Sequence, residues 1–259
     1  MNDMTSTLES QTNHDAEPVS PIRVWDLPTR VFHWSLAISF AGAWLTAESE
    51  RWRNIHVVLG YTLAGLIVFR IVWGLVGSRY ARFGSFVFPP SRMVSYLKSL
   101  LSASPEHHAG HNPAGALAIF GLLALGAVTV ISGYATFQEI GGEWLEELHE
   151  GAANAMLVLV LIHIAGVVVS SFLHKENLAR SMLTGWKMGR DGEGIDRTLA
   201  GPGIILLALV VFFLGFSQTA TGRALIFSSQ VTEAKEPKQW TDQHDRTAKQ
   251  DRHERRDDD

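Results

Sequence analysis

The feature that most constrains this chain is the stretch 151–173, which contains no Asp, Glu, Lys or Arg. A helix of about 20 predominantly apolar residues crosses the roughly 30 Å hydrocarbon core of a bilayer. His149 stands just before this stretch and His163 inside it, fourteen residues apart. Fourteen residues are close to four helical turns, so both imidazoles leave one face of the helix, roughly 21 Å apart. One membrane helix therefore offers two nitrogen ligands at two depths.

Further apolar runs of spanning length surround this one, at residues 31–47, 54–76, 113–138 and 199–221. We expect an all-α integral membrane protein, a four-helix bundle with an additional C-terminal transmembrane helix and disordered tails. Segment 91–101 has helical spacing of apolar residues and is expected along the membrane surface. The expected domains are a disordered tail at 1–21, the membrane domain at 22–187, a linker and fifth span at 188–222, and a charged disordered tail at 223–259.

Composition excludes several classes of protein. The chain has no cysteine, which rules out disulfides, iron–sulfur clusters and covalent c-type haem attachment. The net charge of −4 and the lack of a basic stripe argue against nucleic acid as a partner. The first twenty residues lack the basic and apolar regions of a signal peptide. No general acid, nucleophile or phosphate loop is recognisable, so any enzymatic reaction is expected to be quinone redox chemistry.

The distribution of Lys and Arg indicates orientation, because cytoplasmic loops carry an excess of both. Eleven lie in the N-terminal segment, the second-to-third loop and the segment after the fourth run. The other side has only Arg51 and Arg53. We expect the N-terminus to face the cytoplasm.

This orientation sorts four histidines by depth. His33 begins the first run, and His56 begins the second, which runs in the opposite direction. The expected level pairs are His56 with His149 toward the outside, and His33 with His163 toward the cytoplasm. Two facing imidazoles from separate helices suit a haem iron held by two axial ligands.

Small and charged residues nearby fit the same interpretation. Gly60, Gly151 and Gly166 stand near the histidines and would let a macrocycle approach. Arg70 follows His56 by fourteen residues, level with the inner pair. An arginine in a membrane span needs a partner, and a haem propionate would be suitable.

Other interpretations stay open at this point. A single histidine in a membrane helix is often hydrogen-bonded to a neighbouring helix. Zinc would require three or four ligands together, whereas these histidines sort two and two. A histidine-dependent metal or proton transporter or channel is the alternative function.

Several motifs occur in order along the chain. They are Val24-Trp25-Asp26-Leu27-Pro28-Thr29-Arg30-Val31-Phe32-His33-Trp34, His56-Val57-Val58-Leu59-Gly60-Tyr61, Phe69-Arg70-Ile71-Val72-Trp73-Gly74, Gly77-Ser78-Arg79-Tyr80-Ala81-Arg82-Phe83, Gly110-His111-Asn112-Pro113-Ala114-Gly115 and Leu148-His149-Glu150 through His163. With these motifs the chain resembles the bacterial cytochrome b561 and nickel–iron hydrogenase cytochrome b subunit family, over about residues 22 to 187. The fifth span and the charged tail depart from that family.

The resemblance implies a core with two non-covalent haem b groups in a bacterial inner membrane. It implies His33, His56, His149 and His163 as the axial iron ligands. Such a protein would carry electrons between the quinone pool and a redox partner, such as a cytochrome c or a hydrogenase. The acidic loop 139–147 could dock that partner or be a solvated loop.

The resemblance also suggests a quinone site beside the inner haem. His111, Asn112 and Gly115 occupy the matching turn, and His107 and His108 precede it. The alternative is a solvated loop and helix start, in which Asn112 caps the helix and Pro113 takes its first turn.

Overall fold

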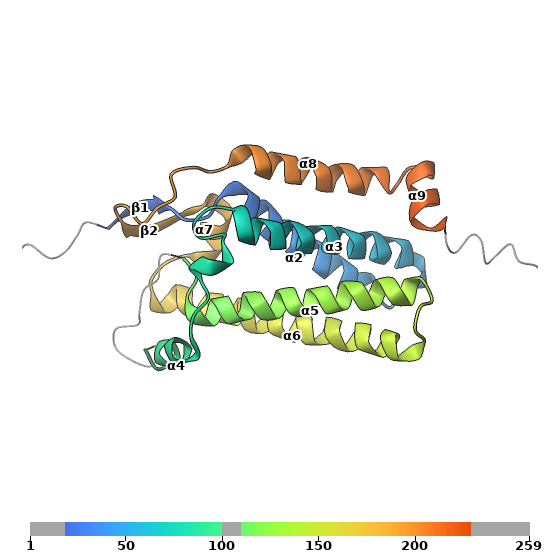
Figure 1. Ribbon diagram of the computed structural model, residues 1–259, viewed down its shortest axis with the longest axis horizontal. Helices are drawn as coiled ribbons and strands as arrows, with labels where there is room; N and C mark the ends of the chain where they lie inside the picture. The colour runs from blue at the N-terminus through green and yellow to red at the C-terminus, as the bar shows by residue number, and fades with distance from the viewer. Residues whose placement is uncertain (1–18, 100–109, 229–259) are drawn as a thin grey trace, which may run out of the picture. The chain divides into compact units, whose positions relative to one another are not determined.

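The computed structural model of the protein describes residues 19–99 and 110–228, most of them helical (Figure 1). The elements in chain order are β1 (Val19–Arg23), α2 (Leu27–Thr46), the 3-10 turn η1 (Glu50–Trp52), α3 (Arg53–Val76), the 3-10 turn η2 (Phe83–Ser85), α4 (Pro90–Ser99), α5 (Pro113–Phe137), α6 (Glu143–Leu173), α7 (Leu178–Thr184), β2 (Trp186–Arg190), α8 (Ala200–Phe216) and α9 (Ala220–Ile226).

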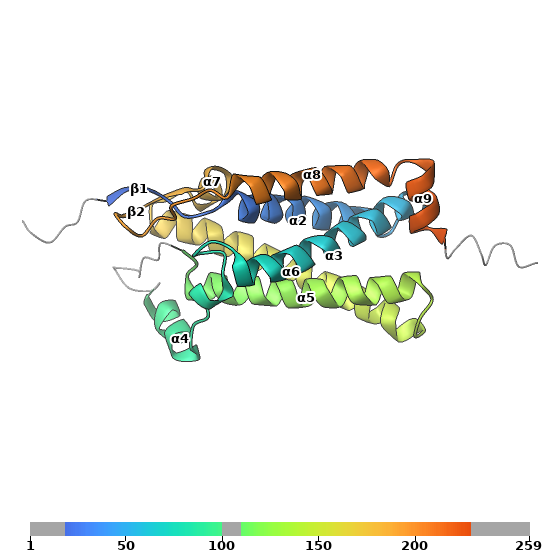
Figure 2. The same cartoon turned by 45° about the horizontal axis from the view of Figure 1, so that its top comes forward.

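Four long helices, α2, α3, α5 and α6, form a bundle (Figure 2). Helix α2 packs on α3, α5 packs on α6, and α3 joins the two pairs through α5. The expected all-α membrane bundle is confirmed. Residues 91–99 of the expected surface segment belong to α4, where the side chain of Tyr96 is buried.

The bundle exposes apolar side chains in the way a lipid-facing protein does. Ile162 and Phe172 of α6 are 60% and 79% exposed. Among the described residues, three helices are long and apolar enough to cross a membrane: Glu50–Val76, Pro113–Phe137 and Glu143–Leu173. A fourth span results when α8 and α9 are counted together. Helix α2 has a spanning length of 20 residues but is not among these helices.

Side-chain caps fix where two bundle helices begin. The Asp26 carboxylate accepts a hydrogen bond from the Thr29 amide at 2.8 Å and caps α2. The Asn112 side chain accepts from the Gly115 amide at 2.7 Å and caps α5. Each cap satisfies a backbone donor that the first helical turn leaves unpaired.

A two-stranded antiparallel sheet joins the start of the chain to the segment after α6. Val19 pairs with Arg190 and Arg23 pairs with Trp186. Residues 19–21 were expected in a disordered tail, yet they form the first part of β1. Their pairing partner lies about 170 residues later, a separation that local sequence reasoning does not reach.

The expected fifth span, 199–221, is interrupted. Helix α8 ends at Phe216 after 17 residues, and α9 begins at Ala220. The chain divides into two compact units, one up to Phe213 and one from Leu214. In the first unit Leu206 of α8 packs against Phe32 and Leu66. In the second, the Thr219 hydroxyl accepts from the Gly222 amide at 3.0 Å and caps α9.

Some expectations fall on residues that the structure does not describe. Residues 1–18 of the predicted N-terminal tail, residues 229–259 of the C-terminal tail, and the pair His107 and His108 lie outside the described residues.

Candidate functional site

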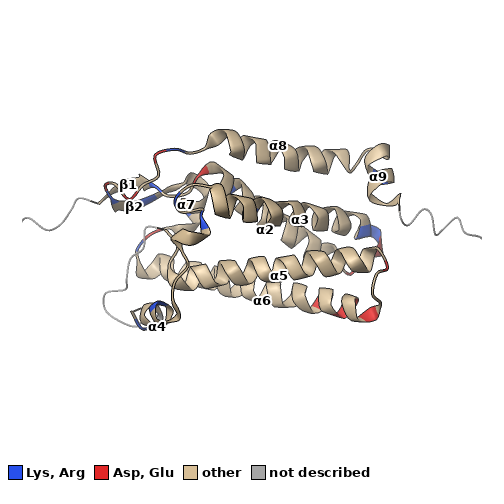
Figure 3. Cartoon of the chain, viewed as in Figure 1, with Lys and Arg blue, Asp and Glu red and all other residues tan. Residues whose placement is uncertain are grey.

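The two ends of the bundle differ in charge (Figure 3). We call the end where α2 meets α3 and α5 meets α6 the acidic end. Its charged residues are Glu48, Glu50, Arg51, Arg53, Glu139, Glu143, Glu146, Glu147 and Glu150. The opposite end, the basic end, carries twelve Lys and Arg against five Asp and Glu among the described residues.

At the acidic end, His56 of α3 and His149 of α6 face each other. Their ring centroids are 6.0 Å apart and their planes are inclined at 83°. His56 lies in the first turn of α3, and His149 lies in the second turn of α6. The structure therefore brings together the pair that the sequence predicted for this level.

Both imidazoles are held by backbone carbonyl groups of neighbouring helices. His56 Nδ1 lies 2.8 Å from the carbonyl oxygen of Ala43, and His149 Nδ1 lies 2.8 Å from that of Thr129. A carbonyl oxygen only accepts, so Nδ1 carries the proton in both rings and donates it. The Nε2 atoms then keep their lone pairs, the state in which histidine binds a metal.

A glycine makes room for one of these rings. A Cβ atom at Gly133 of α5 would lie 2.6 Å from Cε1 and 2.7 Å from Nδ1 of His149. Gly133 follows Thr129 by one helical turn, so a single stretch of α5 supplies both the acceptor and the space. The roles of Ala43, Thr129 and Gly133 could not be predicted from the sequence. A carbonyl acceptor has no side-chain signal, and glycine is common in membrane helices.

At the basic end, His33 of α2 and His163 of α6 lie within electrostatic reach of each other. Both rings are half-buried, and the rings of His33 and Trp34 are nearly perpendicular at a centroid distance of 5.2 Å. The Nδ1 atom of His33 is buried, and no described residue accepts a hydrogen bond from it. His33 is therefore held differently from the two rings of the acidic-end pair.

Apolar side chains fill the layer between the two pairs. Phe40 follows His33 by seven residues, and Met156 lies seven residues from both His149 and His163. Both are buried, and both pack with Ala43 and Leu63. Seven residues are about two helical turns, so Phe40 and Met156 continue the histidine faces. The two levels are separated by a buried apolar layer.

Arg70 is nearly fully buried, at 3% exposure. Its Nη1 donates to the carbonyl of Ala81 at 2.9 Å, and its guanidinium lies 4.7 Å from the ring centre of Phe83. The Asp26 carboxylate lies within electrostatic reach of it and accepts from Trp73 Nε1 at 3.1 Å. Through Ala81 and Phe83, Arg70 thus holds the segment that follows α3 against the bundle.

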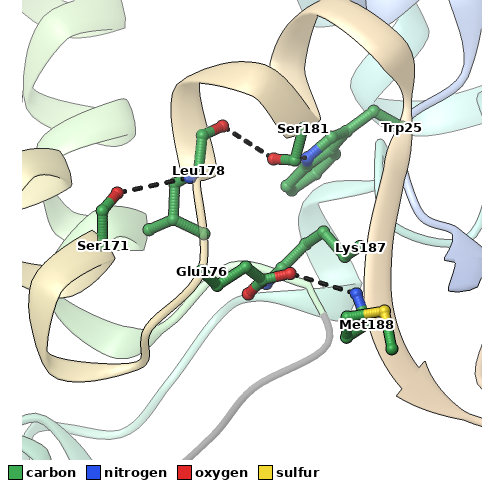
Figure 4. A network of polar contacts seen from close by, with 7 residues as sticks. All are labelled: Trp25, Ser171, Glu176, Leu178, Ser181, Lys187 and Met188. Carbon is green, nitrogen blue, oxygen red and sulfur yellow. Dashed lines mark hydrogen bonds and ion pairs between the residues drawn. The ribbon is translucent and has the colours of Figure 1, made fainter. Parts of the chain in front are cut away.

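A polar network closes the basic end (Figure 4). Lys187 of β2 forms an ion pair with Glu176 at 3.5 Å, and Glu176 also accepts from the Met188 amide. Trp25 Nε1 donates to the Ser181 hydroxyl at 3.3 Å. Burial lowers the pKa of Lys187, while the Glu176 carboxylate raises it.

His111 lies between two aromatic rings at this end. Its ring centre is 4.7 Å from that of Trp25 and 4.5 Å from that of Phe86. Its Nδ1 is buried, and no described residue bonds to it. Burial is the main cause that lowers the pKa of His111 to about 3, and positive charge on Arg70, Lys187 and His163 lowers it further. His111 is therefore neutral at pH 7.

The remaining residues of the suggested quinone turn have local roles. Asn112 is engaged as the cap of α5, and a Cβ at Gly115 would lie 3.1 Å from the Asn112 side-chain oxygen. Asn112 caps α5 and Pro113 stands in its first turn, as predicted for this segment.

The donor set and the spacing fit a metal held between two imidazoles. Metal–imidazole bonds are about 2 Å long, and each ring centre lies roughly 1 Å behind its nitrogen, so two axial rings stand about 6 Å apart. The observed 6.0 Å agrees. No three His, Cys, Asp or Glu side chains gather around one point within residues 19–99 and 110–228.

Open space beside the histidine faces fits a macrocycle. A Cβ at Gly60 or Gly166 would meet no atom within 4 Å. Gly60 follows His56 by four residues and Gly166 follows His163 by three, so each lies on the face of its histidine. Gly151 also has open space, but it follows His149 by two residues and points away from that face.

The model of the family described as prokaryotic cytochrome b561 matches residues 24–185. The chain belongs to this family. The prokaryotic cytochromes b561 are b-type haem proteins of electron transport, and this member is a membrane protein with apolar spanning helices.

Curated relatives carry a more specific name. The chain is 28% identical over 217 residues to the probable Ni/Fe-hydrogenase B-type cytochrome subunit of Azotobacter vinelandii. This alignment covers 66% of the present chain and 90% of the relative. The subunit of the same name in Bradyrhizobium diazoefficiens is 24% identical, over 66% of this chain and 87% of the relative. The probable Ni/Fe-hydrogenase 1 B-type cytochrome subunit of Escherichia coli (strain K12) is 26% identical, over 45% of this chain and 60% of the relative. No solved structure matches the chain significantly.

Proposed function

We propose that this cytochrome b561 family member holds two haem b groups. His56 and His149 ligate one iron, and His33 and His163 ligate the other. The observation that carries the proposal is the acidic-end pair. Its two rings stand at the spacing of axial ligands, and each donates Nδ1–H to a carbonyl so that Nε2 can bind iron.

The second site, at the basic end, is supported by the helices that supply its two histidines. His33 and His163 come from the two helices expected for that level and influence each other electrostatically. His163 shares a face of α6 with His149 because fourteen residues are close to four turns. One helix therefore supplies a ligand to each haem.

Arg70 is the proposed partner of a haem propionate at the basic end. A guanidinium has five N–H donors, and the bond to Ala81 accounts for one of them in the structure. The Asp26 carboxylate offsets part of the positive charge of Arg70, because a buried cation without a counter-charge is costly.

Haem supplies one-electron redox chemistry when bound. The chain's own residues hold and orient the ligands and exclude water. The carbonyls of Ala43 and Thr129 orient the rings of His56 and His149. The missing side chain of Gly133 leaves space for the ring of His149. Phe40 and Met156 form a buried apolar layer between the two histidine levels. This layer disfavours the alternative of a proton channel, which needs a continuous polar path.

We further propose that the chain transfers electrons between a quinone and a redox partner protein in the inner membrane. The curated relatives are named as hydrogenase subunits, which supports a hydrogenase as partner over a cytochrome c. The excess of Lys and Arg at the basic end supports a cytoplasmic position for that end and for the N-terminus. The acidic end then faces the outside, and lipid surrounds the exposed apolar faces.

The proposal is tested by purifying the full chain in detergent and recording its oxidised and reduced absorption spectra. A haem assay against protein concentration should give two b-type haems per chain. A protein that folds as a helical bundle yet carries no haem would contradict the proposed function. Metal or proton flux through vesicles without visible absorption would support the transporter instead.

A further inference from the structure

One stretch of the chain at the basic end carries only positive charge. Residues 77–99, which we call the basic segment, contain no Asp or Glu and four Lys and Arg, namely Arg79, Arg82, Arg92 and Lys98. All four side chains are exposed. No Asp or Glu within residues 19–99 and 110–228 forms an ion pair with any of them. The segment therefore presents four cations whose charge the described part of the chain does not pair.

The basic segment is packed against the side of the bundle. The ring of Phe83 lies so close to α3 that a Cβ atom at Gly74 would overlap with it. The rings of Phe83 and Phe86 also contact Phe120 of α5, at centroid distances of 5.7 and 5.4 Å. Phe120 follows Pro113, the first residue of α5, by seven residues, so these contacts lie about two turns into the helix. The segment is therefore held beside the end of the bundle helices.

Helix α4, the last part of the basic segment, lies across the direction of the bundle helices (Figure 1 and Figure 2). It contacts α5, and the side chain of Tyr96 is buried. Val94 and Lys98 are four residues apart and therefore share a face of α4, and both are exposed. Val87, just before α4, is 66% exposed, and Val94 is 52% exposed. Exposed apolar side chains next to cations are typical of segments that lie in a membrane interface.

Two classes of partner carry the charge that this surface requires, namely anionic phospholipids and acidic proteins in solution. The position beside the first two turns of α5 favours lipid, because the ends of membrane helices lie at the level of the headgroups. The exposed valines favour lipid as well, because they gain contacts with apolar material there. Juxtamembrane Lys and Arg are attracted to anionic headgroups, and a guanidinium donates two parallel hydrogen bonds to a phosphate.

We propose that the basic segment binds anionic phospholipid. Its four cations contact the headgroup phosphates, and its two exposed valines lie among the upper parts of the acyl chains. Because Phe83 and Phe86 fasten the segment to α3 and α5, bound lipid holds the basic end of the bundle at the depth of the headgroups. The inference requires the membrane position of the protein and is independent of the proposed haem ligands.

The test places one fluorescent label next to the proposed lipid. The chain has no cysteine, so Val94→Cys provides a unique attachment site. The labelled full chain is placed in nanodiscs of phosphatidylcholine and phosphatidylglycerol at one fixed ratio, in which the acyl chains of only one of the two lipids carry bromine as a contact quencher. Per brominated lipid, phosphatidylglycerol should quench about fivefold more strongly than phosphatidylcholine, the factor that one Lys or Arg near an anionic surface contributes.

Charge variants of the labelled protein locate the origin of this preference. Arg92→Gln combined with Lys98→Gln should bring the quenching ratio down toward one. Arg51→Gln combined with Arg53→Gln is the matched control, because it also removes two exposed cations, but at the acidic end, and it should leave the ratio unchanged. Salt tests the same point if a charge variant fails to fold. Raising the ionic strength to about 1 M shortens the screening length to roughly 3 Å and should lower the ratio.

Equal quenching by the two lipids overturns the inference, because the label then contacts lipid without selection for charge. No quenching by either lipid overturns it as well and indicates that the segment faces water, where an acidic protein is the partner. A ratio that falls equally in both double variants, or that does not respond to salt, also contradicts it. The haem content of the same samples should not change, so a failure here leaves the proposed function intact, and a protein without haem that still selects phosphatidylglycerol contradicts the proposed function alone.

Discussion

The imidazole of His149 donates its Nδ1 hydrogen to the carbonyl of Thr129, twenty residues earlier, at 2.8 Å. This bond joins α6 to α5 at the level where His149 faces His56 of α3. It fixes the orientation of the ring before any metal binds, and Gly133 provides the space in which the ring lies. The proposed ligand is thus positioned by the packing of two helices.

Replacing Gly133 by alanine should disturb this arrangement. The new Cβ would lie 2.6 Å from the ring of His149, so the ring must shift away from the Thr129 carbonyl. We expect the variant to lose the acidic-end haem or to bind it with a raised reduction potential. The haem content and the redox titration measure this.

Gly65→Ala is the matched control for that variant. A Cβ at Gly65 meets nothing within 4 Å. Alanine is better than glycine in a helix by about 1 kcal/mol, so the control should fold at least as well as the wild type. Equal haem binding in both variants would refute the role of Gly133.

Single ligand variants should each remove one haem. His56→Ala should leave the basic-end haem bound, and His33→Ala should leave the acidic-end haem bound, because the buried apolar layer of Phe40 and Met156 keeps the two sites apart. The haem-to-protein ratio should fall from two to one in each variant. Loss of both haems from a variant that still folds would contradict the pairing by level.

Asp26→Ala should destabilise the protein. The Asp26 carboxylate is fully buried, caps α2, and accepts from Trp73. Removing it leaves two buried donors unpaired, which we expect to cost roughly 2 to 4 kcal/mol. Thermal unfolding in detergent measures the loss. Asp191→Ala, at an exposed carboxylate that accepts from Ser20, is the control and should change little.

Acid should weaken the fold through His111. Its pKa is about 3 in the folded protein and near 6.5 in the unfolded chain. Between these values only the unfolded state binds the proton, so the free energy of unfolding falls as the pH drops from 6.5 toward 3. His111→Phe keeps a ring between Trp25 and Phe86 and should flatten this dependence. Parallel curves for both proteins would show that His111 does not contribute.

The pairing of the four histidines followed from the sequence because helical spacing and alternating span direction set depth. The structure brings the rings of His56 and His149 to a centroid distance of 6.0 Å, at the level that this reasoning predicted. The role of the histidines as haem ligands stays a prediction.

The surroundings of the histidines could not be predicted in the same way. The acceptors of Ala43 and Thr129 are backbone atoms, and which carbonyl a ring meets depends on the rotation of two helices. The anchoring of Arg70 by Ala81 and Phe83 depends on how the segment after α3 folds back. The β1–β2 sheet joins distant segments, and the break after Phe216 interrupts a run that is apolar throughout.

The most direct test of the central claim is near-infrared magnetic circular dichroism of the oxidised, purified chain, which identifies the axial ligands of low-spin haem. Two haems, each with two histidine ligands, are the predicted result. Met156 lies between the two levels on the histidine face of α6 and is the alternative ligand. A haem with one histidine and one methionine ligand would therefore contradict the claim. A chain with fewer than two haems would contradict it as well.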